Sequence, residues 1–443
     1  MNQQELATRA DDALREVLHA TLYDGAPATV VKAPPGAGKT YLLETVASVA
    51  VLSEDMTIAV ATQTNAQSFD LAMRLVTAFP SLPVVLHARA DITLPPALQG
   101  RITHAVRTSD IPDRPAVVLA NTAKWRYVTP SDLPRRFDLL VVDEAYQMTD
   151  TAYAQIAGLA EQHLLVGDPG QISPVVTVDT RAWRSDPCGP HQPAPAALLA
   201  RRPDDVHVVE LPATRRLGTD STMFVQPAFY PELPFSSLRA PRRLSSGKES
   251  GRSGHILSGL GEREIVMAEL PHAVTGPNDD DVADLLSELA AAATAAAVIS
   301  ARGDEPLAAS DIAVACAHVS QVGQVQAALT RRDPSLNQVV VDTSERLQGR
   351  EAELVLVWHP VSGRAEATDF AKDAGRLCVM LSRHRAGCVV VGRAGITQAV
   401  ALSGAGRERV LGVAHDAALA GWRANLDIMQ LLADEDRILR LPG

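Results

Sequence analysis

The segment TVVKAPPGAGKTYLLETVASVA, residues 29–50, decides the fold. It begins as an apolar strand near Thr29, passes through a Pro/Gly loop and continues with the amphipathic spacing of a helix. A strand, a phosphate-binding loop and a helix in this order are typical of a P-loop. A simple Gly/Pro turn before a helix would explain the glycines but not the adjacent Lys39 and Thr40. We therefore predict an α/β protein that binds nucleotide phosphates at this loop.

The loop residues have distinct expected tasks. Small residues let backbone N–H groups close around phosphate oxygens at the start of a helix, Lys39 brings its charge to the β- and γ-phosphates, and the Thr40 hydroxyl is expected to bind Mg²⁺. Ala33 replaces the first glycine of the usual motif, a small departure that a P-loop can absorb. The predicted nucleotide-binding residues are Pro35, Gly36, Ala37, Gly38, Lys39, Thr40 and Tyr41.

A second segment, FDLLVVDEAYQ at residues 137–147, reads as a buried strand that ends on two adjacent carboxylates. The carboxyl ends of parallel strands carry the ligand chemistry of open α/β sheets. Two neighbouring acids repel each other unless each has a separate task. We expect Asp143 to hold Mg²⁺ and Glu144 to orient and deprotonate the attacking water of a P-loop nucleotide hydrolase.

Three further apolar strands also end in polar residues. They are TIAVATQTN from residue 57, AVVLANT from residue 116 and HLLVGDPGQ from residue 163. Each block alone could be an ordinary turn after a strand. Together they predict several parallel strands with their carboxyl ends along one edge of one sheet. The polar residues at these ends are Thr64, Asn65, Asn121, Thr122, Asp168 and Gln171.

The bulk composition limits the class of protein. The chain has 443 residues, 46% of them hydrophobic, as expected for two soluble domains. Its formal net charge of −11 argues against indiscriminate adhesion to nucleic acid but allows a local basic groove. The first residues lack the pattern of a signal peptide, so we expect a cytoplasmic protein. The four cysteines form no C-x-x-C pair and are expected to be buried free thiols: Cys188, Cys316, Cys378 and Cys388.

Two segments have the composition of linkers. Residues 185–205, SDPCGPHQPAPAALLARRPDD, are predicted to form a Pro-rich loop, and residues 239–262 a flexible basic segment rich in Ser, Gly and Arg. Either is a plain linker or a contact for the backbone of a nucleic acid. The spacing of residues 412–439 predicts a helix with Trp422 on its apolar side, packed against the second domain.

The order of the motifs resembles that of superfamily 1 helicases. DEAYQ followed by GDPGQISPV is similar to the branch of the nonsense-mediated-decay helicase and senataxin. The second half continues the likeness, and no accessory-barrel pattern lies between Thr64 and Asp143. The blocks that carry it are VVELPATRR (208–216), FVQPAFYPELPFSS (224–237), DIAVACAHVSQVGQVQAAL (311–329), VDTSERLQGREAELVLV (341–357) and RLCVMLSRHRAGCVVVG (376–392).

The resemblance implies two tandem RecA-like domains, residues 1–212 and 213–443, with a nucleotide cleft between them. It implies that Arg216 and Arg383 reach the γ-phosphate from the second domain and that Gln171 senses it from the first. Gly349 and Glu351 are expected near the phosphates and ribose. Arg215 stands where the family often has an aromatic residue stacked on the base. The residues expected to hold a nucleic-acid backbone are Thr64, Asn65, Thr122 and Thr343.

The predicted function is therefore an ATP- and Mg²⁺-dependent helicase or translocase. It would act on single-stranded DNA or RNA with low sequence specificity, because contacts to phosphates carry no sequence information. The resemblance implies 5′ to 3′ travel and leaves room for a protein partner that supplies strand separation. The alternative is an ATP-driven switch or motor subunit that remodels a protein complex and depends weakly or not at all on nucleic acid. A small-molecule kinase would leave the arginine blocks of the second half unexplained.

Overall fold

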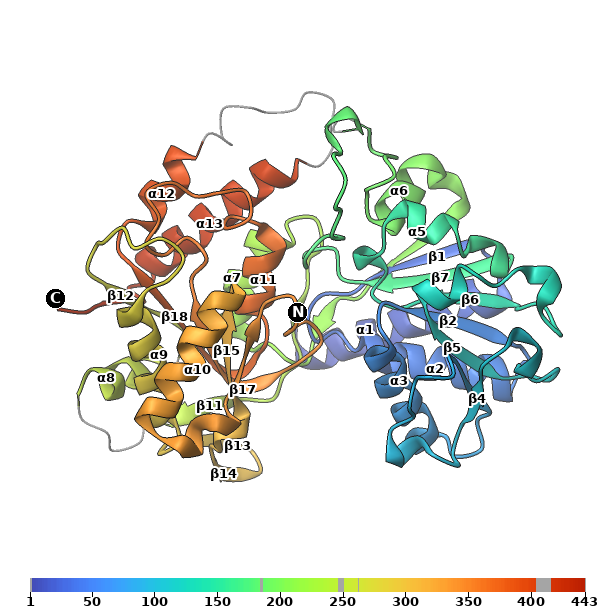
Figure 1. Cartoon of the computed structure of the whole chain (residues 1–443), viewed down its shortest axis with the longest axis horizontal. Coiled ribbons are helices and arrows are strands. Elements are labelled where there is room, and N and C mark those ends of the chain that lie inside the picture. The colour runs from blue at the N-terminus through green and yellow to red at the C-terminus, as the bar shows by residue number, and fades with distance from the viewer. Residues whose placement is uncertain (1, 184–185, 246–250, 262, 404–415, 443) are drawn as a thin grey trace. The chain divides into compact units, whose positions relative to one another are not determined.

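The computed structural model describes residues 2–183, 186–245, 251–261, 263–403 and 416–442. The chain divides into two compact units, each shown as a ribbon in Figure 1. Unit 1 comprises Met1–Pro169 and Ser173–Pro212, and unit 2 comprises Gly170–Ile172 and Ala213–Gly443. Residues 170–172, which the sequence places in the first domain, thus group with unit 2.

Unit 1 is built on an eight-stranded parallel sheet with the order β4-β3-β5-β2-β6-β7-β1-β8. The P-loop follows β1 and the DEAYQ segment follows β6, and β7 separates these two strands. The strands are β1 (Ala28–Lys32), β2 (Ile58–Thr62), β3 (Val84–His87), β4 (Thr103–Ala105), β5 (Val117–Asn121), β6 (Leu139–Val142), β7 (Gln162–Gly167) and β8 (Val206–Glu210). All strands described between Thr64 and Asp143 belong to this sheet.

Helices cover both faces of this sheet, which explains why its strands are almost continuously apolar. Alternate residues of a strand point to opposite faces. Accordingly, Val31 packs in a core with α2 and α3, and Val30 packs on the other face with Trp125 and α5. The helices of unit 1 are α1 (Gln3–Leu18), α2 (Lys39–Leu52), α3 (Asn65–Ala78), α4 (Thr122–Trp125), α5 (Asp150–Ala154) and α6 (Ala194–Arg201).

Unit 2 contains a six-stranded parallel sheet with the order β16-β15-β17-β18-β12-β19. A small antiparallel sheet of β11, β13 and β14 and the short pair β9 and β10 accompany it. The strands are β9 (Ala213–Thr214), β10 (Ser236–Ser237), β11 (Arg242–Ser245), β12 (Ile265–Leu270), β13 (Ala297–Ser300), β14 (Gly303–Pro306), β15 (Ile312–Cys316), β16 (Val340–Thr343), β17 (Ala352–Trp358), β18 (His384–Arg393) and β19 (Ile438–Arg440).

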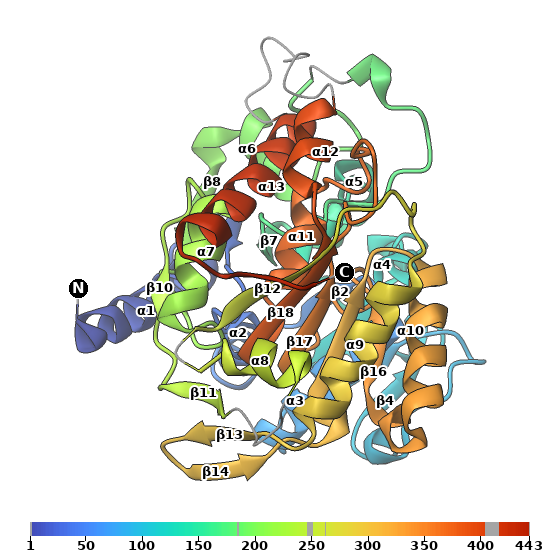
Figure 2. The same ribbon diagram turned by 90° about the vertical axis from the view of Figure 1, so that its left-hand side faces the viewer.

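The larger sheet of unit 2 is also covered on both faces. Helices α8, α9 and α10 pack on one face, and α7, α11, α12 and α13 pack on the other (Figure 2). The helices are α7 (Thr219–Phe229), α8 (Arg252–Ser258), α9 (Asp280–Ala293), α10 (Val319–Arg332), α11 (Ala374–Leu381), α12 (Ile396–Leu402) and α13 (Ala417–Asp434). The predicted α/β class, with two RecA-like domains built on parallel sheets, is confirmed.

The predicted Pro-rich loop at residues 185–205 is partly wrong, because it contains helix α6. Pro193 precedes this helix and Pro195 lies in its first turn, where the missing N–H of a proline costs no helical hydrogen bond. The following Ala-Ala-Leu-Leu-Ala-Arg residues favour helix. Residues 184–185 lie outside the described residues.

The segment predicted to be flexible, residues 239–262, contains β11 and α8 in its described parts. Strand β11 pairs with β13, and Ile256 and Leu257 of α8 are buried in the core of unit 2. Two buried apolar residues in a Ser/Gly-rich segment therefore hold this helix against the core. Residues 246–250 and 262 lie outside the described residues. The predicted C-terminal helix is confirmed as α13, where Trp422 is partly buried against the core of unit 2; residues 412–415 are not described.

None of the four cysteines forms a disulfide, as predicted. Three of them are buried as expected, but Cys188 is only half-buried. In the described part of the chain, no helix combines the length and the apolar character needed to cross a bilayer.

Candidate functional site

The P-loop connects the carboxyl end of β1 to the first turn of α2. Gly36 and Gly38 have φ angles of 71° and 96°, a left-handed backbone that glycine adopts without steric cost. Helix α2 then starts at Lys39, so the loop lies at a helix N-terminus with its unsatisfied N–H groups. The segment therefore has the backbone form that an anion-binding loop needs.

Lys39 and Glu144 form a two-oxygen ion pair. The Lys39 ammonium lies 2.9 Å and 2.8 Å from the two carboxylate oxygens of Glu144, and both side chains are largely buried. Glu144 follows β6 with a left-handed backbone, φ 50° and ψ 45°, which costs about 1 kcal/mol or more outside glycine. Strain of this kind at a charged residue is typical of functional sites. The structure thus brings together the lysine and the acid that the sequence selects from segments 105 residues apart.

Asp143 is the most perturbed acid of this site. Its Oδ1 accepts the backbone N–H of Glu144 at 2.9 Å. Burial, and then the neighbouring Glu144 carboxylate, raise the pKa of Asp143 to about 7. A divalent cation beside such an acid would favour its ionised form, so the donor set fits Mg²⁺. Thr40, the predicted second ligand, follows Lys39 in the first turn of α2.

The remaining predicted loop residues differ in exposure. Pro35 and Ala37 are buried, and the Ala37 N–H donates to the carbonyl of Pro34 at 3.1 Å. Tyr41 is 63% exposed, so its ring contributes little to the core. Among the polar residues at the end of β7, Asp168 is buried. Gln171 is also buried, and within unit 2 its Oε1 accepts a hydrogen bond from Gln348 at 3.3 Å.

The polar residues that follow β2 and β5 lie close together, because Thr62 and Asn121 are partners in the sheet. The Thr64 hydroxyl accepts the N–H of Gln67 at 3.2 Å and caps α3. The Oδ1 of Asn65 accepts a hydrogen bond from Asn121 at 2.7 Å, and the Thr122 hydroxyl donates to the carbonyl of Thr62 at 3.0 Å. These side chains thus hold the strand ends in place. Their role toward nucleic acid stays a prediction.

The arginines of unit 2 gather at the amino ends of strands. Arg216 forms an ion pair with Glu351 and donates to the carbonyl of Ser382 at 3.2 Å. Arg385 donates to the second oxygen of Glu351 at 2.7 Å. Burial would raise the pKa of Glu351, but Arg216 and Arg385 hold it below its ordinary value. Glu351 therefore stays charged and is shared by two guanidinium groups.

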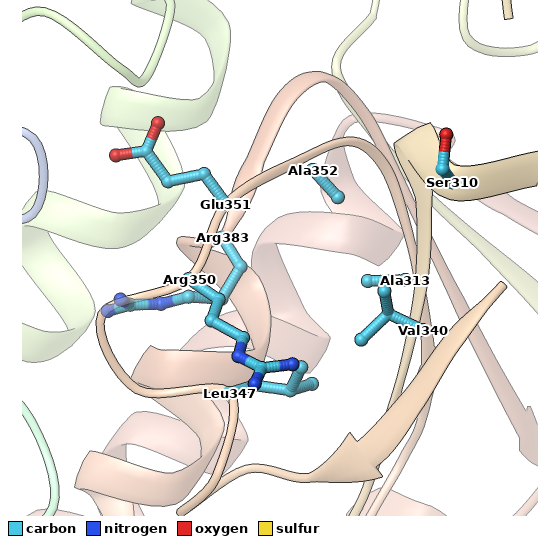
Figure 3. A pocket seen from close by; sticks show the side chains of 8 residues that line it. All are labelled: Ser310, Ala313, Val340, Leu347, Arg350, Glu351, Ala352 and Arg383. Atoms are coloured by element: carbon cyan, nitrogen blue, oxygen red, sulfur yellow. The ribbon is translucent and has the colours of Figure 1, made fainter. Parts of the chain in front are cut away.

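Arg383 is buried beside this cluster. It donates to the carbonyl of Val379 and to the hydroxyl of Ser382, each at 3.3 Å. Together with Arg350 and Glu351 it lines a pocket at the amino ends of β15, β16 and β17 (Figure 3). The floor of this pocket is apolar and includes Val340 and Leu347. Its charged rim suits an anion.

Three predicted site residues of unit 2 do not take part in this cluster of arginines. Gly349 has φ 80° and is exposed in the turn before β17. Arg215 is exposed next to the largely buried Arg216. Thr343 is buried at the carboxyl end of β16, the opposite edge of the sheet from the arginines.

Sequence reasoning missed a buried network behind the arginines. His384 Nε2 lies 2.6 Å from the hydroxyl of Ser221, which also donates to Glu264 at 2.6 Å. Glu264 in turn pairs with Arg239. Burial, followed by the charges of Arg239 and Arg216, lowers the pKa of His384 to about 3. His384 is the first residue of the apolar strand β18, and only its place beside Arg383 in the S-R-H-R block could have drawn attention to it.

A glycine-rich loop at a helix N-terminus, a paired lysine and acid, and a second buried acid at one edge of a parallel sheet define a P-loop nucleotide hydrolase. The comparisons agree with that class. Two different protein-family models, each described as an AAA domain, match residues 10–182 and 279–395. The enzyme class predicted from the sequence, a nucleotide hydrolase, is thus confirmed. A comparison with curated proteins finds no match.

Several solved structures are similar to the chain at low identity. The helicase of PRRSV is 13% identical with a TM-score of 0.43, covering 86% of this chain and 54% of that one. An arterivirus nonstructural protein 10 (helicase) in complex with DNA is 16% identical with a TM-score of 0.43, covering 84% and 64%. The Escherichia coli DEAH/RHA helicase HrpB is 14% identical with a TM-score of 0.45, covering 89% and 43%. The chain thus spans between 43% and 64% of the length of these proteins.

Proposed function

We propose that this protein is an ATP- and Mg²⁺-dependent motor of the superfamily 1 helicase type that acts on single-stranded nucleic acid in the cytoplasm. The observation that carries the proposal is the arginine cluster of unit 2. A small-molecule kinase needs the P-loop of unit 1, but it has no use for a second parallel-sheet unit with buried arginines. The motif order of the DEAYQ branch supports the same choice.

In the proposed reaction, unit 1 holds and activates the reactants. Lys39 leaves Glu144 and binds the β- and γ-phosphates, Thr40 and Asp143 hold Mg²⁺, and Glu144 is released to accept a proton from the attacking water. In this structure Lys39 is paired with Glu144. The ion pair would thus keep Glu144, the general base, occupied until a nucleotide binds. Mg²⁺ supplies charge neutralisation of the phosphates when it is bound.

The arginines of unit 2 complete the site in this proposal. Arg216 and Arg383 would stabilise the charge that develops on the transferred phosphoryl group, and the nucleotide would compete with Glu351 for Arg216. Gln171 would report the state of the γ-phosphate. Opening and closing of the two domains would then couple hydrolysis to movement along the strand.

The strand itself would lie on backbone contacts from Thr64, Asn65, Thr122 and Thr343. Such contacts would make binding independent of sequence and sensitive to salt. By the motif resemblance, travel is 5′ to 3′, and a protein partner would supply targeting or strand separation. Substrates with a single 5′ or 3′ tail test the direction, and unwinding only from a 3′ tail would contradict it.

The decisive experiment measures the ATPase rate with no polymer, with oligo-dT and with oligo-U. We expect at least one polymer to stimulate hydrolysis, and the stronger stimulus identifies DNA or RNA as the substrate. Lys39→Ala should remove the rate in all three conditions. Lys32→Ala is the matched control, since Lys32 also pairs with a glutamate, Glu210 at 2.9 Å, on the same sheet. A rate that neither polymer changes would favour the alternative of a switch that remodels a protein complex.

A further inference from the structure

Two hydrogen bonds link the chain segments of unit 2 that carry its buried arginines. Arg216 lies just before α7, and Arg383 directly precedes β18 (Figure 1). Arg216 donates to the carbonyl of Ser382, the neighbour of Arg383, at 3.2 Å. Ser221, in the first turn of α7, lies 2.6 Å from Nε2 of His384, the first residue of β18. Segments more than 160 residues apart in the sequence are thus held together at two points.

The hydrogen bonds of Ser221 define the proton position on His384, which is neutral because its pKa is about 3. The single hydroxyl proton of Ser221 is donated to Oε2 of Glu264 at 2.6 Å, and the Ser221 backbone N–H donates to the same oxygen at 3.0 Å. His384 Nε2 therefore donates to the Ser221 oxygen, and its Nδ1 is left as a bare acceptor. The imidazole is thus fixed in one tautomer and one orientation.

Glu264 anchors the contact from the residue before β12. Its carboxylate is buried and pairs with Arg239. Its backbone N–H donates to Asp220, the neighbour of Ser221, at 2.7 Å. Arg437 in turn donates to both carboxylate oxygens of Asp220, at 2.7 Å and 2.6 Å. The start of α7 is therefore held by two acids, each of which has its own arginine.

Gly218 shows how closely these groups are packed. A Cβ atom at this position would collide with the Glu264 carboxylate and with the guanidinium of Arg239. The φ angle of Gly218 is −76°, which any residue can adopt, so the space and not the backbone requires glycine here. Gly218 lies two residues after Arg216. The packing that fixes Glu264 thus also fixes the backbone beside that arginine.

Two atoms of this region are left without a hydrogen bond, which distinguishes it from a network built for stability alone. Nδ1 of His384 and Nε of Arg216 are buried and have no hydrogen-bond partner within the described ranges. Unpaired buried polar groups destabilise a fold, and their presence in a native structure is often explained by a functional role. An arginine that acts on a transferred phosphoryl group needs accurate placement, since a displacement of about 1 Å can lower turnover about a hundredfold.

We propose that Ser221, Glu264 and His384 are positioning residues, which hold Arg216 and Arg383 at the separation that the transferred phosphoryl group requires. The inference rests on the proposed function, since it assumes that both arginines act on that group. The three residues act only through the arginines, by linking the start of α7 to the start of β18. Their loss should therefore lower kcat and leave KM for ATP almost unchanged, because unit 1 still binds the nucleotide.

The test compares two amides at position 384 in the full chain. The glutamine amide nitrogen reaches the place of imidazole Nε2, so His384→Gln keeps a donor to Ser221, whereas the shorter His384→Asn does not. At saturating polymer, His384→Asn should lower the kcat of ATP hydrolysis about 10- to 100-fold, and His384→Gln by less than about threefold. KM for ATP should change by less than about twofold in both variants.

His359→Gln is the matched control. His359 is also a buried histidine of unit 2, and its Nδ1 accepts the N–H of Val361 at 3.2 Å. It follows β17, at the edge of the sheet opposite to the arginines. This variant should lose thermal stability and keep its kcat. Thermal melting of every variant, with rates measured well below the lowest midpoint, separates loss of fold from loss of positioning.

A double-mutant cycle shows whether His384 acts through the arginines. In the Arg216→Ala protein, His384→Asn should cost less than about threefold in kcat, because the group that it positions is already absent. Ser221→Ala removes the same contact from the other side and should give the same results. It replaces His384→Asn in the cycle if that variant does not fold.

Equal kcat for His384→Asn and His384→Gln, or losses that multiply fully in the cycle, would overturn the positioning role alone. A loss of kcat in His359→Gln as large as that in His384→Asn would also overturn it, because general destabilisation would then explain both. If Arg216→Ala and Arg383→Ala themselves leave turnover unchanged, the proposed function fails together with this inference.

Discussion

The two units place their charged residues at opposite edges of similar parallel sheets. In unit 1, Lys39, Asp143 and Glu144 follow the carboxyl ends of β1 and β6. In unit 2, Glu351 and Arg383 directly precede β17 and β18, and Arg216 joins them from the segment before α7. The loop of unit 1 offers helix N–H groups to an anion, whereas unit 2 offers long guanidinium side chains. In the proposed function, the two units would therefore contact phosphates in two different ways.

In both units the acidic and basic side chains of the site form ion pairs with one another, but the numbers of acids and bases differ. In unit 1 one lysine faces two acids, and burial, followed by the charge of Glu144, raises the pKa of Asp143. In unit 2 two arginines, Arg216 and Arg385, share Glu351 and hold its pKa below its ordinary value, and Arg385 also lies 3.9 Å from Glu353. Unit 1 is thus short of positive charge, which Mg²⁺ would supply. In unit 2 a phosphate would compete with Glu351 for these arginines.

The sharpest test of this comparison is the loss of the single lysine. Lys39→Ala removes the only cation paired with Glu144 in the described residues, so we expect hydrolysis to vanish and ATP binding to weaken. Glu144→Gln should also stop turnover, but ATP and Mg²⁺ should still bind, because the phosphate contacts remain. Measurement of ATP affinity and of turnover for both variants separates the two roles. Failure of Glu144→Gln to bind ATP would contradict the division of labour between Asp143 and Glu144.

The next effect concerns the arginines of unit 2. An arginine that stabilises a transferring phosphoryl group is worth roughly 10³ to 10⁵ in turnover. We expect Arg383→Ala and Arg216→Ala each to lower polymer-stimulated turnover by at least about a hundredfold, while strand binding without nucleotide survives.

Arg331→Ala is the control for these variants, because Arg331 is a largely exposed arginine of unit 2 that pairs with Asp284 at 3.0 Å. Such pairs are typically worth no more than about 1 kcal/mol. If all three variants lose turnover equally and mildly, unit 2 does not complete the active site.

The buried His384 predicts a pH effect that belongs to unit 2. Its pKa falls from 6.5 to about 3 on folding, so the unfolded chain takes up its proton first as the pH drops. Stability that depends on neutral His384 is present above pH 6.5 and is lost as the pH falls toward about 3. His384→Asn removes the contact with Ser221 and should destabilise the protein by about 1–3 kcal/mol at pH 8.

The difference between this variant and the wild type should shrink at pH 5, because asparagine does not titrate. Other buried histidines, His87 and His359, cancel in the comparison because both proteins contain them. Denaturant midpoints at the two pH values measure the effect. A difference that is constant or grows on acidification would show that His384 is not held neutral by its surroundings.

The sequence predicted the parts of the fold in which one residue pattern has one structural meaning. The apolar strands followed by GAGKT, DEAYQ and GDPGQ predict one parallel sheet. The pairing of β1 and β6 with β7 confirms this prediction. The sequence predicted that Lys39 and Glu144 lie at one edge of this sheet, although it did not predict that they form an ion pair. Composition alone was misleading at residues 185–205 and 239–262, where a few apolar residues outweigh many Pro, Ser and Gly residues.

Long-range partners of polar residues could not be predicted. Glu351 was expected near the phosphates and ribose, and nothing in its neighbourhood in the sequence indicates that Arg216, 135 residues away, binds it. Ser221 and Glu264 likewise meet His384 only through the packing of α7 and β12 against β18. The sequence shows which charged residues exist in a motif, but the packed structure decides which of them neutralise one another.

The smallest effect separates two neighbours that share one acid. Arg385 also binds Glu351, but it is half exposed, whereas the side chain of Arg216 is only 11% exposed. An ion pair screened by water is worth at most about 1 kcal/mol, so Arg385→Ala should lower turnover by no more than about fivefold. Its loss should also leave Arg216 as the main partner of Glu351, which tightens their pair and slightly weakens ATP binding. We expect a small rise in KM with little change in kcat, the reverse of the result for Arg216→Ala. A loss in kcat as large as that of Arg216→Ala would mean that Arg385 itself reaches the phosphates, and the distinction between the buried and exposed arginines of unit 2 would fall.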